Sequence, residues 1–399
     1  MTALTSRTGP LTVRPITADE ELATLLEVGG SFLQTPSWAA SKPDWRRQYL
    51  GWFDAEGTRV GAGLVLARPV PRTRRSFAYL PEGPGLPWDE VAKDPAAWFD
   101  PLTDWARGAG AFALRVGCPV TSRTWAPDVV KKQIGEGGLL SFTSLPPAFD
   151  NPSARALETY LDGAGWTPIG WGTSNAVGQP RFLCIVDLEG RDAPTVLRSM
   201  NQQWRRNIKK AEKAGVEVVV RGPEGLDAFY EQYTESAHRD GFFPRPKFYF
   251  ERIMKAFAAD PRVDASFYEA NVAGDVLASA LMIRVGPTFS YLYGGSTSRN
   301  RDARASNALQ WKAIRDAIDL GCTAYDFRGF NTSLGATSPL TGLLLFKLGA
   351  GADVVEKVGE RELVVNRFWH KAFEAAMQGR TLLTTWRKRG QPQATEAEV

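Results

Sequence analysis

The alternation of apolar and polar positions follows nearly the same course in two parts of the chain. Each part reads as a β-hairpin that ends in a tyrosine, followed by a helix that ends at a glycine and then by a short apolar strand. The hairpin glycine precedes the tyrosine by 22 residues in one part and by 19 in the other, and the tyrosine precedes the helix-ending glycine by 31 and by 28. These landmarks are Gly57, Tyr79 and Gly110 in the first part, and Gly274, Tyr293 and Gly321 in the second.

Strand patterns of period two that alternate with helical patterns predict mixed sheets flanked by helices, and hence an α/β fold. Two copies of one unit predict two like-folded domains, related by internal duplication, with a cleft between them as a common place for a ligand. The chain of 399 residues is long enough for two domains that each have a core. A turn-rich stretch at 166–179 marks the crossover, so the first copy is placed in residues 1–178.

Composition narrows the class of protein. No apolar run approaches the roughly 20 residues that span a bilayer, and the N-terminus lacks the apolar core of a secretion signal, so we expect a soluble, cytoplasmic protein. Cys118, Cys184 and Cys322 have no paired spacing and are expected to be buried thiols. With only two histidines, 132 positions apart, neither a metal site nor a Cys-His dyad is expected. The net charge of +4 permits an anionic partner without requiring one.

A strongly basic helical pattern runs over residues 193–214 and stops at Gly215. Residues four apart lie on the same side of a helix, so its cations form stripes that attract polyphosphate through their summed field. A solvated helix face is the ordinary alternative, with Trp204 and Ile208 on the buried side. The candidate residues for binding a polyphosphate such as RNA are Arg205, Arg206, Lys209, Lys210 and Lys213.

A second candidate is the stretch Tyr291-Leu292-Tyr293-Gly294-Gly295-Ser296. Strand alternation predicts that Tyr291 and Tyr293 share a face, and the two glycines allow a close backbone approach by a ligand, although tandem glycines at a strand end are also common in plain turns. The strand, loop and helix here resemble the cofactor-binding part of GNAT acetyltransferases. Their pyrophosphate-binding loop needs glycine, whereas residues 301–308 contain none, so a coenzyme A donor is not expected.

Three further places could carry chemistry. Phe346 and Lys347 stand in an apolar run, where a lysine either reaches the surface or presents its ammonium inside a cleft. Residues 34–42, with Trp38 and Lys42, read as a capped helix start. The loop at 238–246 brings Arg239 and Arg245 near aromatic residues and suits an anion, although helix linkers are often charged.

Together these stretches resemble the FemABX family, whose members transfer an amino acid from aminoacyl-tRNA to an amine of a peptidoglycan precursor. The resemblance runs through most of the chain in a matching order: 34–42, 79–84, 205–216, 238–245, 291–296, 309–311 with 325–329, and 346–347 with 358–359. It implies two GNAT-like domains and a C-terminal helix that returns to the first one. The domains would then be 1–178 with 366–399, and 179–365. No long helical arm is inserted, so the chain resembles the compact FemX type, and we expect a monomer.

The resemblance also implies roles for single residues. Lys42 and Arg245 would contact the diphosphate of a nucleotide-linked acceptor with help from Tyr293, and Arg239 competes with Arg245 for that role. Lys347, in its Phe346-Lys347 motif, would lie at the aminoacyl ester. Trp38, Tyr291, Gly294 and Gly295 complete the expected substrate-binding set.

The expected reaction is direct aminolysis of an activated ester, with Lys347 stabilising the oxyanion and no cofactor besides aminoacyl-tRNA as co-substrate. The acceptor stays open between UDP-MurNAc-pentapeptide, a lipid-linked precursor and a small natural-product amine. Two rivals belong to other classes: an acyl-coenzyme A N-acyltransferase of the GNAT type, and a non-catalytic protein that binds tRNA or cell wall.

Overall fold

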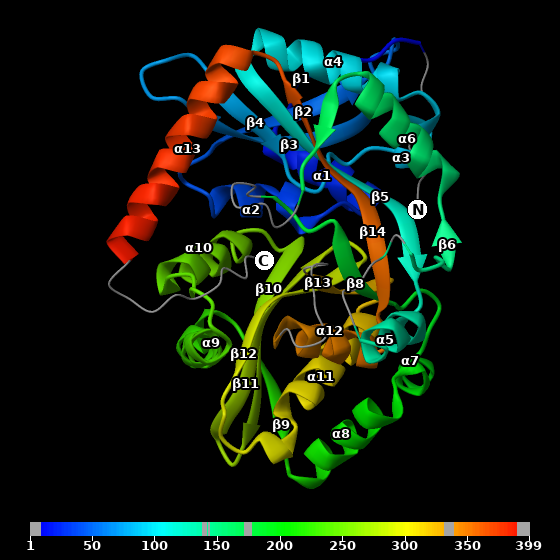
Figure 1. Cartoon of the computed structure of the whole chain (residues 1–399), viewed down its shortest axis with the longest axis vertical. Coiled ribbons are helices and arrows are strands. Elements are labelled where there is room, and N and C mark those ends of the chain that lie inside the picture. Colours follow the sequence, from blue (N-terminus) through cyan, green and yellow to red (C-terminus); the bar gives the residue numbers. More distant parts are fainter. Residues whose placement is uncertain (1–8, 138–141, 143, 171–177, 331–338, 389–399) are drawn as a thin grey trace. The chain divides into compact units, whose positions relative to one another are not determined.

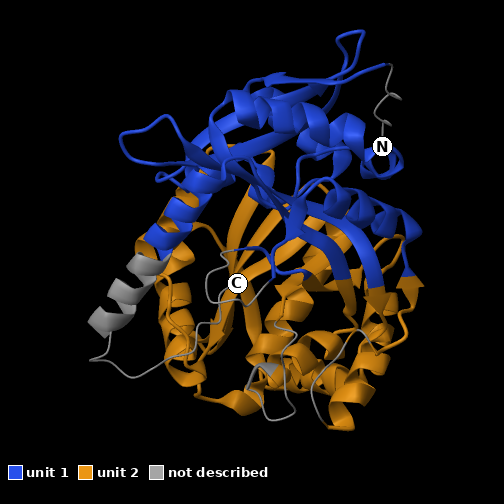
Figure 2. Cartoon of the chain, turned by 45° about the horizontal axis from the view of Figure 1, so that its top comes forward, with its two compact units in different colours: residues 1–123, 150–181, 356–393 blue, residues 124–149, 182–355, 394–399 orange. Residues whose placement is uncertain are grey.

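Two sets of strands organise the chain into two units (Figure 1, Figure 2). The structure, a computed structural model, describes residues 9–137, 142, 144–170, 178–330 and 339–388. Unit 1 consists of residues 1–123, 150–181 and 356–393, and unit 2 of 124–149, 182–355 and 394–399. The polar composition of 330–339 and 390–399 predicts a loop and a tail, but residues 331–338 and 389–399 lie outside the described residues.

The strands of unit 1 form an antiparallel meander that ends in one parallel pair. Strands β1, β2, β3 and β4 pair in chain order, and β4 then pairs in parallel with β5 along its whole length, from Ser76 to Leu80. A parallel neighbour requires a crossover, which α3 and α4 supply. The strands are β1 (Thr12–Pro15), β2 (Arg46–Phe53), β3 (Arg59–Pro69), β4 (Ser76–Leu80), β5 (Ala111–Trp125), the two-residue β6 (Phe149–Asp150), and β7 (Trp166–Pro168), which pairs with β14 (Asp353–Val364).

The helices of unit 1 begin and end at ordinary local signals. Helix α1 starts at a capping box between Thr17 and Glu20 and ends at Gly29, which has a left-handed backbone. The last helix, α13, packs Phe373 on Phe77 of β4 with ring centroids 5.8 Å apart. The bounds are α1 (Ala18–Val28), α2 (Pro36–Ala40), α3 (Trp88–Lys93), α4 (Pro95–Gly108), α6 (Pro152–Gly163) and α13 (Arg367–Lys388).

Unit 2 repeats this plan. Strands β9, β10, β11 and β12 pair antiparallel, β12 pairs in parallel with β13, and β13 pairs antiparallel with β8. Helices α9 and α10 lie on one side of β10, β11 and β12, and α11 lies on the other (Figure 1). The strands are β8 (Phe182–Asp187), β9 (Glu217–Arg221), β10 (Val263–Val272), β11 (Asp275–Val285), β12 (Thr288–Ser296) and β13 (Ala324–Gly329). The helices are α5 (Pro127–Gly135), α7 (Ala193–Ser199), α8 (Gln202–Lys213), α9 (Leu226–Asp240), α10 (Lys247–Phe257), α11 (Ala305–Asp319) and α12 (Pro339–Gly349).

The predicted duplication is therefore confirmed at the level of topology. The sequence β3, β4, helix, β5 in unit 1 matches β11, β12, helix, β13 in unit 2, with the same antiparallel and parallel pairings. Each unit has its own apolar cluster, which includes Trp52 and Trp98 in unit 1 and Met282 and Tyr325 in unit 2. The mixed α/β fold class predicted from the pattern is correct. Among the described residues, no helix combines the length and the hydropathy that a bilayer crossing requires.

The single helix predicted over 193–214 is wrong, because the structure breaks it into α7 and α8. Met200 has an extended backbone, with φ −65° and ψ 148°, and the Asn201 side chain accepts a hydrogen bond from the backbone N–H of Trp204. Asn is a strong N-cap because its side chain satisfies an amide that the first turn leaves unpaired. The sequence therefore held the signal for a second helix start. Trp204 and Ile208 lie on the buried side of α8, as predicted.

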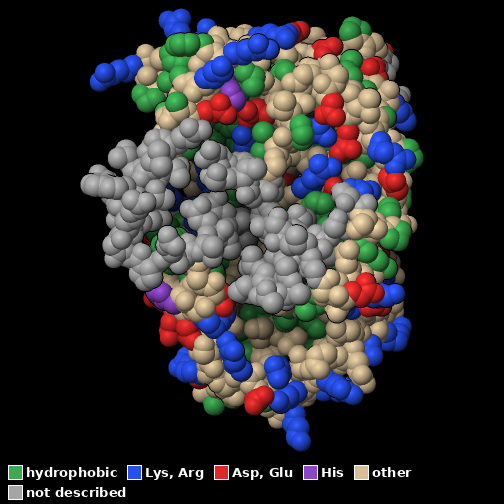
Figure 3. Space-filling view, in the orientation of Figure 1, with side chains coloured by type: hydrophobic (Ala, Val, Ile, Leu, Met, Phe, Trp, Pro, Cys, Tyr) green, Lys and Arg blue, Asp and Glu red, His purple; other side chains and the backbone are tan. Residues whose placement is uncertain are grey.

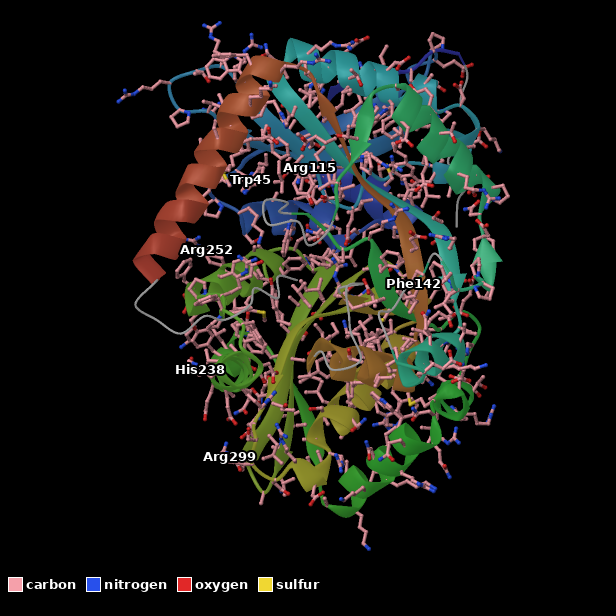
Figure 4. The ribbon with its side chains drawn as sticks, in the orientation of Figure 1. Trp45, Arg115, Phe142, His238, Arg252 and Arg299 are labelled. Atoms are coloured by element: carbon pink, nitrogen blue, oxygen red, sulfur yellow. The ribbon has the colours of Figure 1, made fainter. Side chains whose placement is uncertain are left out.

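A buried ionic cluster lies in unit 1, where β14 carries Glu360 and Glu362. Arg115 of β5 lies 2.7 Å from Glu362 and 3.8 Å from Glu360 (Figure 4), and Tyr79 donates a hydrogen bond to Glu360. The Glu362 carboxylate also forms a hydrogen bond with the imidazole of His370, at 2.9 Å. Burial raises the pKa of Glu360 to about 7, against the opposing effect of Arg115. Burial therefore makes the charge of Glu360 costly to keep, although Arg115 lies nearby.

We expect the Glu360→Gln substitution to remove a pH-dependent loss of stability. Between about pH 4.5 and pH 7 the folded chain holds a proton on Glu360 that the unfolded chain releases, so the wild type loses stability as the pH rises. The free energy of unfolding of the variant, relative to the wild type, should increase by roughly 1–3 kcal/mol from pH 4.5 to pH 8. Urea titrations across this range measure the difference. Glu90→Gln, at an exposed acid of α3, is the control, and parallel curves for Glu360→Gln and wild type would contradict the expectation.

Candidate functional site

Strands β12 and β13 separate soon after they begin, and this divergence defines the candidate site in unit 2. They pair only over Thr288, Phe289 and Ser290, whereas β4 and β5 of unit 1 stay paired to the end of β4. Each of the two strands also has a shift in register with its other neighbour, after Tyr291 in β12 and after Asp326 in β13. Bulges of this kind end pairing and redirect side chains, and they are frequent beside functional sites.

The bulge in β12 separates the two tyrosines, so the prediction that they share a face is wrong. Met282 of β11 pairs with Tyr291 and the adjacent Leu281 pairs with Tyr293, which leaves Leu292 as the extra residue. One additional residue reverses the alternation of a strand. Tyr291 consequently packs against Phe327 and the core cluster beside α11, while Tyr293 faces α9 and α10.

The bulge in β13 is centred on Arg328, whose φ of +61° lies in the left-handed region. This conformation costs a residue with a side chain on the order of 1–2 kcal/mol, so local contacts must hold it. Asp326 supplies them: its carboxylate accepts a hydrogen bond from the Arg328 backbone N–H at 2.6 Å and lies 3.1 Å from the guanidinium. Both side chains are buried.

Lys347 of α12 reaches this bulge. Its ammonium donates to the carbonyl oxygen of Gly329 at 2.7 Å and to that of Arg328 at 3.3 Å, and the residue is only 3% exposed. Burial lowers the pKa of Lys347 below its ordinary value, and the charge on Arg328 acts in the same direction, while Cys184 and Asp326 oppose both. An ammonium has three N–H donors, and the described residues provide acceptors for two of them. The third can serve a bound oxygen atom.

Phe346, one residue earlier, has a packing contact that the sequence did not reveal. Its ring lies 4.7 Å from the Trp204 ring, and its carbonyl oxygen accepts a hydrogen bond from the Trp204 indole at 2.9 Å. These contacts join the basic helix α8 to the helix that carries Lys347. Phe346 therefore holds α12 in place from the side, and its ring is engaged by the protein itself.

Tyr293 and Arg245 belong to one aromatic cluster on the α9 and α10 side. The Tyr293 hydroxyl lies 3.3 Å from that of Tyr249, and the guanidinium of Arg245 lies over the Tyr249 ring at 5.6 Å. Burial, with the neighbouring Tyr293 second, raises the pKa of Tyr249 well above its ordinary value. Arg239 is placed differently: it donates to the Ser296 carbonyl at 2.6 Å and pairs with Asp240 at 2.9 Å. Of the two competing arginines, Arg245 is the one beside the tyrosine hydroxyls.

The two predicted glycines accommodate the protein's own atoms. A Cβ at Gly294 would lie 2.3 Å from the Tyr291 hydroxyl, and a Cβ at Gly295 would lie 2.3 Å from the backbone oxygen of Gln232 in α9. The close approach predicted at these positions is therefore made by Tyr291 and by α9. In unit 1, Lys42 lies over the Trp38 ring at 3.8 Å, just after α2.

The basic residues of α8 differ in how far they are engaged. Arg205 donates to the carbonyl oxygens of Arg198 and Met200, and Lys210 pairs with Asp302 at 2.9 Å. Within the described residues Arg206, Lys209 and Lys213 are exposed and have no acidic partner. Figure 3 shows basic side chains over the lower part of the molecule, where Figure 1 labels α8.

Sequence reasoning missed Asp326, Arg328 and Tyr249 as members of the site. The sequence did indicate Asp326 and Arg328. They are opposite charges separated by one residue in an otherwise apolar strand, and a buried charge needs a partner. Tyr249 had none, because one more aromatic on an amphipathic helix reads as core. The three cysteines are buried, as expected, and burial raises the pKa of Cys118 and Cys184 to about 12.

Two α/β units of one plan, with the parallel strand pair of unit 2 opened beside a buried lysine, define a duplicated α/β protein. The family model described as the FemAB family matches residues 26–273 and 264–378, so the chain belongs to the FemAB family. It is an aminoacyltransferase of that family.

Individual relatives agree with this assignment. A UDP-N-acetylmuramoylpentapeptide-lysine N(6)-alanyltransferase of Weissella viridescens is 26% identical over 309 residues, which cover 76% of this chain and 81% of the relative. A lipid II:glycine glycyltransferase of Staphylococcus aureus (strain MSSA476) is 23% identical over 418 residues, covering 86% and 90%. The crystal structure of FemX superposes with a TM-score of 0.74 at 20% identity, covering 91% of this chain and 99% of that one, which shows a shared fold.

The packing of α9 on β12 predicts a specific cost for a methyl group at Gly295. Gly295→Ala should lower the free energy of unfolding by about 1–3 kcal/mol, because the added Cβ meets backbone atoms of Gln232 and Tyr233 that cannot rotate away. Gly342→Ala in α12 is the matched control, since no atom lies within 4 Å of its added Cβ and alanine favours a helix. Urea denaturation of the two variants measures the contrast. Equal stabilities would show that α9 does not pack this closely.

Proposed function

We propose that this protein transfers an amino acid from aminoacyl-tRNA to an amine of a peptidoglycan precursor and forms a peptide bond by direct aminolysis. The observation that carries the proposal is the buried ammonium of Lys347 at the diverging ends of β12 and β13. The family relationship supports the same reaction class, because the two relatives are named as an alanyltransferase and a glycyltransferase.

The reaction needs few protein groups. The acceptor nitrogen attacks the ester carbonyl carbon, the carbonyl oxygen gains negative charge, and the C–O bond to the ribose oxygen then breaks as the amide forms. The ribose oxygen leaves with a proton, and the nitrogen loses one. Because the ester is already activated, the protein must mainly hold the two reactants together and stabilise the oxyanion, which are worth several kcal/mol each.

Lys347 is suited to the second task. Two of its N–H groups are held by the carbonyl oxygens of Arg328 and Gly329, so the direction of the third is set before a substrate binds. A fixed donor in a dry site stabilises developing charge more than a mobile one in water. In this proposal, the lowered pKa of Lys347 is offset when the oxyanion forms beside it, since an adjacent negative charge favours the ammonium form.

The acceptor would be held through its anionic part. Arg245, beside the hydroxyls of Tyr249 and Tyr293, provides a guanidinium and O–H donors that suit a phosphate. Lys42, stacked on Trp38, keeps the role in phosphate binding that the resemblance implies. The relatives are named for a UDP-linked and a lipid-linked acceptor, so both are candidates here, beside a natural-product amine.

The donor would be held in part by α8. Arg206, Lys209 and Lys213 present exposed cations along the helix, and such a stripe attracts an RNA backbone through its field. Lys210 is less available because Asp302 pairs with it. At the start of α11, the N-cap residue is Arg304, with a φ of +58°. Its bulky side chain stands in place of the glycine of a coenzyme A loop.

The overall function is tested by product analysis. Wild-type protein is incubated with a mixture of tRNAs charged with isotope-labelled amino acids and with each acceptor separately: UDP-MurNAc-pentapeptide, lipid II, or a panel of amine natural products. Mass spectrometry should show one acceptor heavier by a single amino-acid residue, and hydrolysed RNA should abolish the product. Transfer of acetyl groups from acetyl coenzyme A, with none from charged tRNA, would overturn the proposal.

Lys347→Met should lower kcat by about 100-fold to 1000-fold, because a fixed cation at the oxyanion is worth on the order of 3 kcal/mol. The KM for the acceptor should change little, since the ammonium contacts the ester rather than the acceptor phosphate. Lys347→Arg, which keeps a cation and donors to the two carbonyls, should retain more activity than Lys347→Met. A higher KM at unchanged kcat in Lys347→Met would assign the residue to binding. Circular dichroism and a urea titration of both variants would separate loss of folding from loss of catalysis.

A further inference from the structure

Unit 1 contains a pocket that the proposed chemistry does not use. Its volume is about 260 Å³, and it lies over β2, β3, β4 and β5 beside α4. Four arginines line it, Arg46 and Arg47 from β2 and Arg74 and Arg75 from the loop between β3 and β4. None of its lining residues is acidic.

The floor of the pocket is made by small side chains on neighbouring strands. Ala67 of β3 pairs with Ala78 of β4, and Ser76, two residues before Ala78 in β4, pairs with Ala111 of β5, so four short residues lie in this part of the sheet. Larger residues at these positions would fill the space.

The loop that carries Arg74 and Arg75 is held by its own hydrogen bonds. The backbone N–H of Val70 donates to the Arg75 carbonyl at 2.8 Å, the Thr73 hydroxyl donates to the Val70 carbonyl at 2.9 Å, and it accepts from the Arg75 N–H at 3.1 Å. A Cβ at Gly110 would lie 2.7 Å from the Arg74 carbonyl oxygen, so the turn before β5 packs on the same loop. The two arginines are thus presented from a fixed backbone.

The charge of these arginines is not neutralised within unit 1. Among the residues that the structure describes, Arg46, Arg47, Arg74 and Arg75 form no ion pair with Asp or Glu. Asp104, the residue before Trp105 in α4, is paired with Arg107 at 2.9 Å and does not line the pocket. Basic side chains also gather along the upper part of the space-filling view, over this unit (Figure 3). Arg46 shares a face of the sheet with Ala67, whereas Arg47, the next residue of β2, turns its side chain to the opposite face. The guanidinium groups that remain around the hollow favour phosphate, which guanidinium binds in a bidentate way.

Trp105 of α4 supplies an aromatic wall and is half-buried. An aromatic ring beside arginines is the combination that binds single-stranded RNA, by stacking a base while the cations hold the backbone. An anionic membrane is less well matched, because none of the exposed large apolar side chains of the described residues lines this pocket. Such side chains would be needed to enter the bilayer beside the cations.

We propose that this arginine pocket of unit 1 is a second RNA contact of the enzyme, which binds a backbone phosphate and a stacked nucleotide of the tRNA. The inference rests on the proposed function, because it assigns the pocket to the same co-substrate. It adds to that function a contact on a unit that does not carry Lys347. The pocket would then contribute to the affinity for the RNA and not to the transfer step.

The test measures binding of deacylated tRNA by fluorescence anisotropy over a series of salt concentrations, without any transfer reaction. Arg46→Ala/Arg74→Ala should weaken binding about tenfold or more at low salt and reduce the slope of log Kd against log salt by roughly one to two. Ala67→Leu keeps every charge but fills the floor, and it should weaken binding severalfold. The matched control is Lys93→Ala/Arg155→Ala, which removes two exposed cations of the same unit outside the pocket and should bind as the wild type does.

Several outcomes would overturn the inference. Unchanged RNA binding in both pocket variants would do so, as would a loss in the arginine variant with none in Ala67→Leu, which would indicate a diffuse basic surface. The pocket would be assigned to a membrane if its variants lost flotation with vesicles that contain phosphatidylglycerol but kept their affinity for RNA. The transfer assay on the wild-type protein distinguishes failure of this inference from failure of the proposed function. If product forms but RNA binding does not depend on the pocket, only the inference about the pocket is rejected. If no product forms from charged tRNA, the proposed function itself is rejected.

Discussion

The rest of the candidate site depends on the burial of one ammonium group. Moving a cation out of water costs several kcal/mol unless polar partners replace its hydration. Lys347 obtains these partners from the carbonyl oxygens of Arg328 and Gly329, and those oxygens are available because β13 bulges out of register at this point. The bulge in turn requires Arg328 in a left-handed conformation and Asp326 to hold it. A strained strand and a buried charge thus stabilise each other.

The two units show how one topology can serve different purposes. In unit 1 the parallel strands β4 and β5 remain paired along the whole of β4, and nearby acids are buried in a network with Arg115 and Tyr79. In unit 2 the equivalent strands part after three residues and expose backbone groups that Lys347 then uses. Duplication supplied the plan twice, and local bulges rather than a new fold made the second copy chemically distinct. The parts of unit 1 left out of this chemistry include the arginine pocket.

Much of the fold could be predicted from the sequence, because the hairpins, the helix-ending glycines and the helical patterns are local signals. The same locality explains the errors. A bulge at Leu292 depends on what the neighbouring strand does, so simple alternation placed Tyr291 and Tyr293 together wrongly. The break at Met200 was overlooked because the basic pattern continues across it, although Asn201 is a recognisable cap. In the site, Lys347 and Tyr293 could be found from motifs, whereas Tyr249 is brought in only by tertiary packing.

The indole of Trp204 has a consequence for how the basic helix α8 and Lys347 could influence each other. It is buried in α8, packs at a tilt against the Phe346 ring and donates a hydrogen bond to the carbonyl oxygen of that residue, which directly precedes Lys347. In the proposed reaction, a shift of α8 on binding a polyanion would pass through this rigid bicyclic ring to the peptide bond next to Lys347. Occupancy of the basic helix and the direction of the ammonium would then be mechanically linked through a single side chain.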